Sequence, residues 1–231
     1  FKFMVKSVAE KHGLRATFMP KPFKHLTGNG CHCHVSVWDK KGKENAFADK
    51  KDELGLSKEG MNFLGGIMKH AQGMTAITNP TVNSYKRINA AGTASGATWA
   101  PNSVTWSGNN RTHMVRVPGP GRFELRLPDG ATNPYLLQAV VIAAGLDGLK
   151  TKADPGKRHD NDMYAQPELA ADAPRLPLNM LDALRTFDTD AGLKSILGEE
   201  FSAAFLKLKL GEWNSYTSHL TEWERETTLD I

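Results

Sequence analysis

Apolar residues recur every three or four positions in two early stretches of the chain, which predicts helices with one apolar face. The first stretch covers residues 1–12, and Gly13 directly after it is a typical C-cap residue. The second runs from Ser57, a favourable N-cap residue, to Asn79, where Pro80 stops it. We expect a helix over each stretch.

Helical and polar segments alternate in the C-terminal half. Pro134 occupies a favourable first helical position, and the apolar run 136–146 after it predicts a buried helix. Beyond Gly148 the chain becomes polar and rich in proline, which indicates a segment that wraps around the surface. The tail is helical again, and we expect its tryptophans, Trp213 and Trp223, in the core. Its apolar stripe consists of Phe201, Phe205, Leu208, Tyr216, Leu220 and Trp223.

Alternation of apolar and polar residues predicts strands in four places. These are residues 14–19, the residues that follow the glycine turn 28–30, and a pair formed by 115–117 and 122–129. The Pro-Gly-Pro-Gly run 118–121 joins that pair. Together with the helices, these strands favour an α+β fold in which a sheet carries the polar site and helices back it.

A long polar segment lies between Ala90 and Gly108, with Trp99 and Trp106 embedded in it. It is too long for a hairpin turn. Long loops without secondary structure of their own are often lids over active sites, and we expect a lid here.

Composition limits the class of protein. The 231 residues, 40% of them hydrophobic and with a net charge of +4, suit one large or two small globular domains. The basic residues are not gathered into one block, so a nucleic acid partner is not expected. No apolar run approaches the roughly 18 residues that span a bilayer, so no membrane partner is expected either.

The two cysteines give information about the cellular compartment and about whether the chain holds a structural zinc site. With only Cys31 and Cys33, and no secretory leader, a cytoplasmic enzyme is the default expectation. The run Cys31-His32-Cys33-His34 argues against structural zinc, because consecutive strand residues point to both faces and cannot surround one ion. We expect both cysteines to be small buried apolar groups.

Residues suited to chemistry gather on two predicted strands. His32 and His34 share one strand face behind the turn that begins at Gly28, which suits a metal or a phosphate. Glu124 and Arg126 share one face of a later strand by the same alternation. Histidine, carboxylate and arginine on neighbouring strands suit a divalent metal that holds a polyphosphate.

Arginines near these strands favour an anionic substrate, because a guanidinium binds carboxylate or phosphate through two parallel hydrogen bonds. They are Arg87, Arg111, Arg116, Arg122 and Arg126. Simpler interpretations stay open for each residue alone. Taken alone, His32 is consistent with a structural histidine, and Glu124 with one half of a salt bridge to Arg126 or Arg122. Any single arginine is consistent with an ordinary surface charge.

Longer motifs occur in order along the chain: Gly30-Cys31-His32-Cys33-His34, Asn79-Pro80-Thr81-Val82-Asn83-Ser84-Tyr85-Lys86-Arg87, Asn110-Arg111, Glu124-Leu125-Arg126-Leu127-Pro128-Asp129 and Asn133-Pro134-Tyr135. Together they resemble the C-terminal catalytic domain of glutamine synthetase over nearly the whole chain, and most closely its type III branch, which includes γ-glutamylmethylamide synthetases. The resemblance implies an α+β fold with an antiparallel sheet backed by helices. It also implies that residues 1–231 form this domain without its N-terminal part.

The activity implied by the resemblance is an ATP-dependent ligase that forms the γ-amide of glutamate from ammonia through γ-glutamyl phosphate. Mg²⁺ or Mn²⁺ would hold the nucleotide phosphates. The family also implies a ring-type homo-oligomer, with a dodecamer expected. The alternatives are a γ-glutamylmethylamide synthetase that uses methylamine, a non-catalytic assembly protein that keeps the fold, and a plain metal-binding module.

Motif positions imply roles for single residues. His32 and Glu124 would ligate the metal. The residues that would bind ATP are His34, Ser36, Arg116 and Arg122. The residues that would bind glutamate are Gly28, Arg87, Arg111 and Arg126, and the catalytic pair that neutralises the transferring phosphoryl group would be Arg111 and Arg116.

Some positions depart from the family pattern. The usual flap glutamate is replaced near Thr93, in a loop lengthened by residues 94–102, and Thr27 stands where an Asn is usual. The loop before Arg122 lacks its usual lysine. The chain also opens at Phe1 within a helical pattern, so we expect a fragment that lacks further metal carboxylates and is inactive alone. The amine substrate stays open between ammonia and methylamine.

Overall fold

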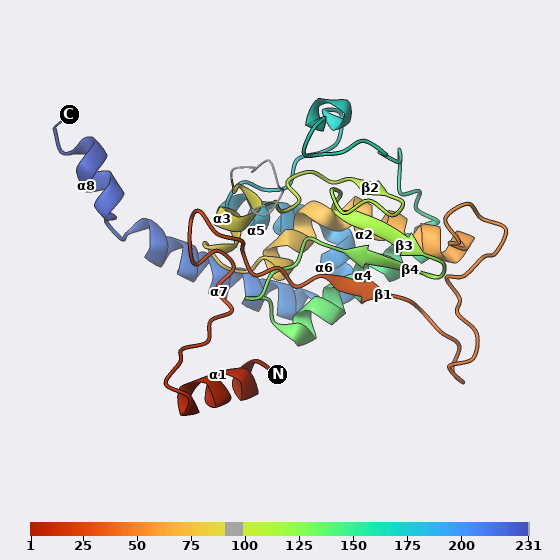
Figure 1. Ribbon diagram of the computed structural model, residues 1–231, viewed down its shortest axis with the longest axis horizontal. Coiled ribbons are helices and arrows are strands. Elements are labelled where there is room, and N and C mark those ends of the chain that lie inside the picture. The colour runs from red at the N-terminus through yellow and green to blue at the C-terminus, as the bar shows by residue number, and fades with distance from the viewer. Residues whose placement is uncertain (91–98, 231) are drawn as a thin grey trace.

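The structure, a computed structural model, describes residues 1–90 and 99–230. Four strands form one sheet in the spatial order β1–β4–β3–β2. In Figure 1 they lie side by side next to α2 (Lys58–Thr78) and α4 (Pro134–Thr151). Helices α1 (Lys2–Lys11) and α8 (Glu222–Thr228) project away from this body. The strands are β1 (Cys33–Val35), β2 (Trp106–Ser107), β3 (Val115–Gly119) and β4 (Arg122–Leu125).

The sheet is mixed. β4 pairs antiparallel with both β1 and β3, and the β3–β4 hairpin turns at 118–121 as predicted. β2 pairs parallel with β3, because residues 108–114 carry the chain back to the starting end of β2 before β3 begins. The expected α+β class is therefore confirmed, but the expectation of an antiparallel sheet is wrong for the β2–β3 pair.

The predicted strand over residues 14–19 is wrong. This stretch has no strand conformation, and its side chains at Leu14 and Met19 are exposed. Asn29 Nδ2 donates to the Met19 carbonyl oxygen at 2.7 Å, and the Phe18 ring lies edge-on to Phe1, with ring centroids 5.9 Å apart. A strand needs a neighbouring strand for its ladder of hydrogen bonds, and the described residues offer none here.

Two buried helices begin as the sequence predicts. In α2 (Lys58–Thr78) the Ser57 hydroxyl accepts a hydrogen bond from the Gly60 backbone at 3.0 Å. In α4 (Pro134–Thr151) the Asn133 side chain accepts from the Tyr135 backbone at 2.9 Å. Side-chain caps of this kind satisfy backbone N–H groups that have no partner within the helix.

Two shorter helices, α1 and α3, lie in the N-terminal part of the chain. Helix α1 (Lys2–Lys11) confirms the first predicted helix, and Gly13 after it has a φ of 69°. Helix α3 (Ser84–Ile88) follows α2 directly and carries Arg87. No helix in the described part of the chain combines the length and apolarity that crossing a bilayer requires.

The core lies between the sheet and α2. Phe123 of β4 stacks on Phe47, with ring centroids 6.1 Å apart, and both rings contact Phe63 of α2. All three are buried. This apolar layer fixes which face of the sheet points outward.

The C-terminal third differs most from expectation. Residues 152–178 wrap the edge of β2 as predicted: the Leu176 N–H donates to Asn102, and the His159 N–H donates to Trp106. The amphipathic helix α5 (Met180–Thr189) was not predicted from the sequence. The elements of this region are η1 (Pro167–Ala170), α5 (Met180–Thr189), α6 (Ala191–Leu197), α7 (Glu199–Thr217) and α8 (Glu222–Thr228).

The two tail tryptophans do not both belong to the core. Trp213 is half-buried, but Trp223 is 67% exposed, so its predicted core position is wrong. The reason is that Thr221 starts a new helix through a capping box with Glu224, and this helix lies beyond the body of the protein in Figure 1.

Candidate functional site

Strand alternation builds a polar face on the sheet opposite the core. In β4 the buried Phe123 and Leu125 face the core, and Glu124 between them faces the other way. Arg116 of β3 and His34 of β1 stand directly opposite Glu124 in the strand register. Three polar side chains thus start from adjacent positions of one sheet face.

Glu124 is the centre of this face. Its Oε2 accepts a hydrogen bond from Arg116 Nη1 at 2.9 Å, and its Oε1 accepts from Arg126 Nη1 at 2.8 Å. His32 Nδ1 lies 3.1 Å from the same Oε1. The Glu124 side chain is 5% exposed. The predicted meeting of His32 and Glu124, which come from distant parts of the chain, is therefore confirmed.

Electrostatics set the protonation states of this pair. Burial raises the pKa of Glu124, but the Arg116 hydrogen bond and the charge of Arg126 outweigh it, so the pKa lies below its usual range. Burial and then the Arg126 charge lower the pKa of His32 to about 4, although Glu124 opposes this. At neutral pH the carboxylate is charged and the imidazole is neutral, which are the forms that bind metals.

The donor set fits a divalent metal in chemical type. A neutral imidazole and a carboxylate both ligate Mn²⁺, and carboxylates also suit Mg²⁺. Among the described residues, no group of three or more His, Cys, Asp or Glu side chains is placed to hold an ion. The described part of the chain therefore offers two ligands rather than a closed site.

Arg87 lies under the glycine turn that precedes β1. It is buried, and its Nη1 donates to the Leu127 carbonyl at 2.9 Å. A Cβ added at Gly30 would lie 2.9 Å from Arg87 Nη2 and 3.1 Å from His32 Nε2, and one at Gly28 would lie 2.5 Å from the Pro20 carbonyl oxygen. Gly28 is needed because the Pro20 backbone leaves no room for a Cβ, whereas a side chain at Gly30 would displace Arg87 and His32.

The remaining predicted site residues form no hydrogen bond or ion pair with Glu124 in the described structure, although His34 starts from the position opposite it. Arg111, Arg122 and His34 are exposed. The Ser36 hydroxyl accepts a hydrogen bond from Trp38 Nε1 at 3.1 Å. The structure thus brings together His32, Glu124, Arg116 and Arg126, with Arg87 and Gly28 beside them.

Two residues at the site were missed from the sequence. Asn109 Oδ1 accepts from Arg116 Nε at 2.8 Å and from Arg116 Nη2 at 2.5 Å, so it orients that guanidinium. The Trp99 ring lies 5.9 Å from the Arg126 guanidinium carbon. The sequence pattern gives no signal that links Asn109 to Arg116 or Trp99 to Arg126.

The two cysteines differ in exposure. Cys31 is exposed and Cys33 is half-buried, so the prediction of two buried cysteines is wrong for Cys31, which precedes the strand and does not share its core-facing side. Position 93, where the family glutamate was expected, and residues 91–98 of the predicted lid lie outside the described residues. Residues 99–107 do not form the expected lid, because most of them are buried and they include β2.

Comparison with known proteins identifies the family. A sequence profile described as "Glutamine synthetase, catalytic domain" matches residues 1–228. The chain belongs to the glutamine synthetase family. Within this family, glutamine synthetase from Rhizobium leguminosarum bv. phaseoli is 74% identical over 231 residues, covering 100% of this chain and 53% of the relative.

Other relatives in the family differ in their named substrate. A glutamate–methylamine ligase from Methyloversatilis universalis is 43% identical over 236 residues, covering 100% of this chain and 52% of the relative. A solved structure of a GmaS/ADP complex superposes with a TM-score of 0.92 at 62% identity, covering 100% of this chain and 53% of that one. The chain therefore spans about half the length of the curated relatives it matches.

Proposed function

We propose that this chain supplies the C-terminal catalytic domain, residues 1–231, of an ATP-dependent ligase that makes glutamine from glutamate and ammonia. The observation that carries the proposal is the Glu124 carboxylate held by Arg116, Arg126 and His32 on the polar sheet face. The support from relatives is the 74% identity with a glutamine synthetase over the whole of this chain.

The reaction has two steps. An oxygen of the glutamate γ-carboxylate attacks the γ-phosphorus of ATP and ADP leaves, which gives an acyl phosphate. The nitrogen of ammonia then attacks the acyl carbon, phosphate leaves, and the nitrogen gives up a proton. Such chemistry asks the protein mainly to position the reactants and to neutralise charge.

His32 and Glu124 would hold a divalent ion, Mg²⁺ or Mn²⁺. When bound, the ion neutralises charge on the nucleotide phosphates. The neutral imidazole and the charged carboxylate support this assignment, because both are already in the protonation state that ligation needs. Further ligands would have to come from the nucleotide, water or residues outside the described part of the chain.

The arginines supply positive charge for the anionic substrates. Arg87 and Arg126 would bind the glutamate carboxylates beside Gly28. Arg126 Nε is buried without a hydrogen-bond partner among the described residues, which leaves one donor for a ligand. Arg111 and Arg116 would neutralise the transferring phosphoryl group, and the nucleotide would contact His34, Ser36, Arg116 and Arg122.

The complete protein would work as a cytoplasmic homo-oligomer of ring type, with a dodecamer as the proposed form. Support comes from family membership and from apolar side chains that the projecting helices leave exposed, among them Phe3 of α1 and Leu229 just after α8.

The variant Glu124→Gln tests the site. It keeps the shape of the side chain and removes its charge, so we expect kcat for ADP formation to fall at least about a hundredfold in the complete protein. The matched control is Glu53→Gln, since Glu53 pairs with Arg158 on the exposed surface. Unchanged turnover in Glu124→Gln, with the fold intact by circular dichroism, would remove Glu124 from the site.

Methylamine is the second candidate acceptor. The methylamine ligase relative at 43% identity and the GmaS structures at 59% and 62% identity favour it. Steady-state kinetics of the complete protein with each amine decide between them. A kcat/KM for methylamine well above that for ammonia would reverse the proposed order. No glutamate-dependent ADP formation with either amine would favour the non-catalytic assembly protein.

A further inference from the structure

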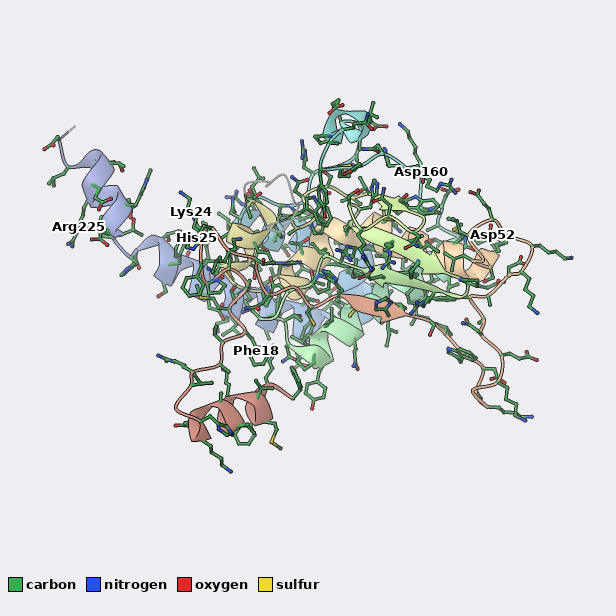
Figure 2. The ribbon with its side chains drawn as sticks, viewed as in Figure 1. Phe18, Lys24, His25, Asp52, Asp160 and Arg225 are labelled. Atoms are coloured by element: carbon green, nitrogen blue, oxygen red, sulfur yellow. The ribbon has the colours of Figure 1, made fainter. Side chains whose placement is uncertain are left out.

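A large cavity lies outside the proposed active site. Its volume is about 1010 Å³, at the upper end of the usual size of small-molecule pockets. The loop 20–26, helix α3, the start of α5 and the C-terminal helices form its walls. Figure 2 shows Lys24 and His25 of that loop near the point where α7 leaves the body, with Arg225 of α8 farther out. The described lining includes none of the residues assigned to the ligase site.

The charged side chains that line the cavity are basic. Lys21, Lys24 and Lys86 contribute to it, and the described lining contains no Asp or Glu. Lys21 is only 6% exposed, and its Nζ donates to the Leu26 carbonyl oxygen. Among the described residues it has no carboxylate partner. A buried ammonium without a counter-charge is costly, so this wall favours an anion.

Tyr85 of α3 lines the same cavity through its ring. The residue is 4% exposed, and its hydroxyl oxygen has almost no accessible surface, so a ligand in the cavity does not reach it. Tyr85 therefore adds apolar ring surface to the lining.

The opposite wall is aromatic. Trp213 and Tyr216 of α7 lie with ring centroids 5.6 Å apart, and Trp223 of α8 completes that side. Leu178 and Met180 add apolar surface. Flat rings on one wall and ammonium groups on another suit a molecule that has a flat apolar body and an anionic group.

We propose that this cavity binds a small organic anion with a flat apolar body, its anionic group at Lys21 and its body on the aromatic wall of α7 and α8. This binding is independent of the proposed ligase activity, because the two sites share no residue among those described.

Calorimetry on the complete protein tests the proposal with two probes of the same shape and opposite charge. We expect 2-naphthoate to bind saturably at one site per chain, and 2-naphthylmethylammonium to bind at least about tenfold more weakly. Saturation with a non-hydrolysable ATP analogue should leave the Kd of 2-naphthoate unchanged. Equal affinity for both probes, or competition with the nucleotide, would overturn the proposal.

Variants locate the binding in the cavity. Lys21→Met keeps the length of the side chain and removes its charge, and we expect it to raise the Kd of 2-naphthoate about tenfold or more. Lys41→Met, on an exposed loop, is the matched control and should leave the Kd unchanged. Lys86→Met changes an exposed lining residue with no risk to the fold, and a several-fold rise in Kd is expected.

Tyr85→Phe should leave the Kd of 2-naphthoate unchanged, because the cavity does not expose the hydroxyl. An unchanged Kd in both Lys21→Met and Lys86→Met would exclude the cavity as the anion site. Binding of 2-naphthoate only after the oligomer is dissociated would identify the cavity as a contact between subunits and would also overturn the proposal.

Discussion

Glu124 shows at the scale of one residue why the polar face attracts anions. Its single negative charge meets the positive charges of Arg116 and Arg126, while His32 beside it is neutral at pH 7 because its pKa is about 4. The cluster therefore keeps a net positive charge. A phosphate or carboxylate that enters the site would neutralise this excess, whereas a neutral ligand would not.

Asn109 is the residue whose role the sequence did not indicate. Its side-chain oxygen accepts two hydrogen bonds from Arg116, which leaves Arg116 Nη1 directed at Glu124. Replacing it by Leu should free this guanidinium and lower kcat/KM of the complete enzyme by about five- to tenfold, the expected effect of losing one exposed charge-assisted interaction.

The variant Asn109→Asp tests whether Asn109 acts by orienting the Arg116 guanidinium or only by maintaining the local structure. It keeps the oxygen acceptor, so we expect activity close to that of the wild type, with an unchanged Tm for both variants because Asn109 is exposed. Equal loss of activity in the Asp and Leu variants would contradict an orienting role for the side-chain oxygen.

At the scale of elements, glycines let α2 and α4 pack with their backbones in contact. A Cβ added at Gly66 would lie 2.0 Å from the Ala144 carbonyl oxygen, and one at Gly148 would lie 2.2 Å from the Asn62 carbonyl oxygen. Neither backbone has room to move, because the same helices also pack against the phenylalanines of the core. These two glycines therefore define the distance between the helices.

Gly66→Ala tests this packing. We expect it to reduce the free energy of unfolding by about 3 kcal/mol or more, because the added methyl group forces two helices apart. Gly211→Ala in α7 is the matched control. No atom lies within 4 Å of its added Cβ, so it should stabilise the helix by about 0.5–1 kcal/mol. Urea unfolding of both variants measures the difference, and equal effects would contradict the packing argument.

At the scale of the whole molecule, His70 of α2 connects three parts of the helical layer. Its Nε2 lies 2.9 Å from Asp147 of α4, and its Nδ1 lies 2.8 Å from Asp190, the N-cap of α6. Burial alone lowers the pKa of His70, but the hydrogen bonds and charges of Asp190 and Asp147 outweigh it and raise the pKa above 6.5. The protonated histidine therefore stabilises the fold.

This network predicts a pH dependence. A folded-state pKa above the unfolded value gives stabilisation that is complete below pH 6.5 and is lost as the pH rises through the folded-state pKa. His70→Gln should lower Tm below pH 6.5 and flatten its decline on the alkaline side. His12→Gln, at an exposed histidine, is the control. Parallel Tm curves for wild type and His70→Gln between pH 6 and 9 would contradict the role.

The pKa of His32 is lowered rather than raised, so its effect on stability changes at acid pH. Because its folded-state pKa of about 4 lies below 6.5, its contribution to stability is present above pH 6.5 and is lost as the pH falls toward 4. Measurements above pH 6.5 therefore isolate the effect of His70.

Local interactions made much of the fold predictable from the sequence. Ser57 and Asn133 cap their helices through hydrogen bonds that span two or three residues, and the run 118–121 permits only a tight turn. Alternation placed Glu124 opposite the core for an equally local reason, since consecutive strand residues point to opposite faces. The family resemblance also indicated which side chains would gather at the site.

Only the tertiary structure decided how distant segments meet. The contact between His32 and Glu124, the parallel pairing of β2 with β3 and the two hydrogen bonds from Arg116 to Asn109 join segments whose relative position no local pattern specifies. The helices α7 and α8 are amphipathic by sequence, but whether Trp223 is buried depends on what lies beside it. Sequence by itself determined the elements and the faces of their side chains, because sterics and short-range hydrogen bonds act within a few residues. Pairing, register and burial were decided by the packing of the whole chain, because that free energy depends on contacts between remote parts.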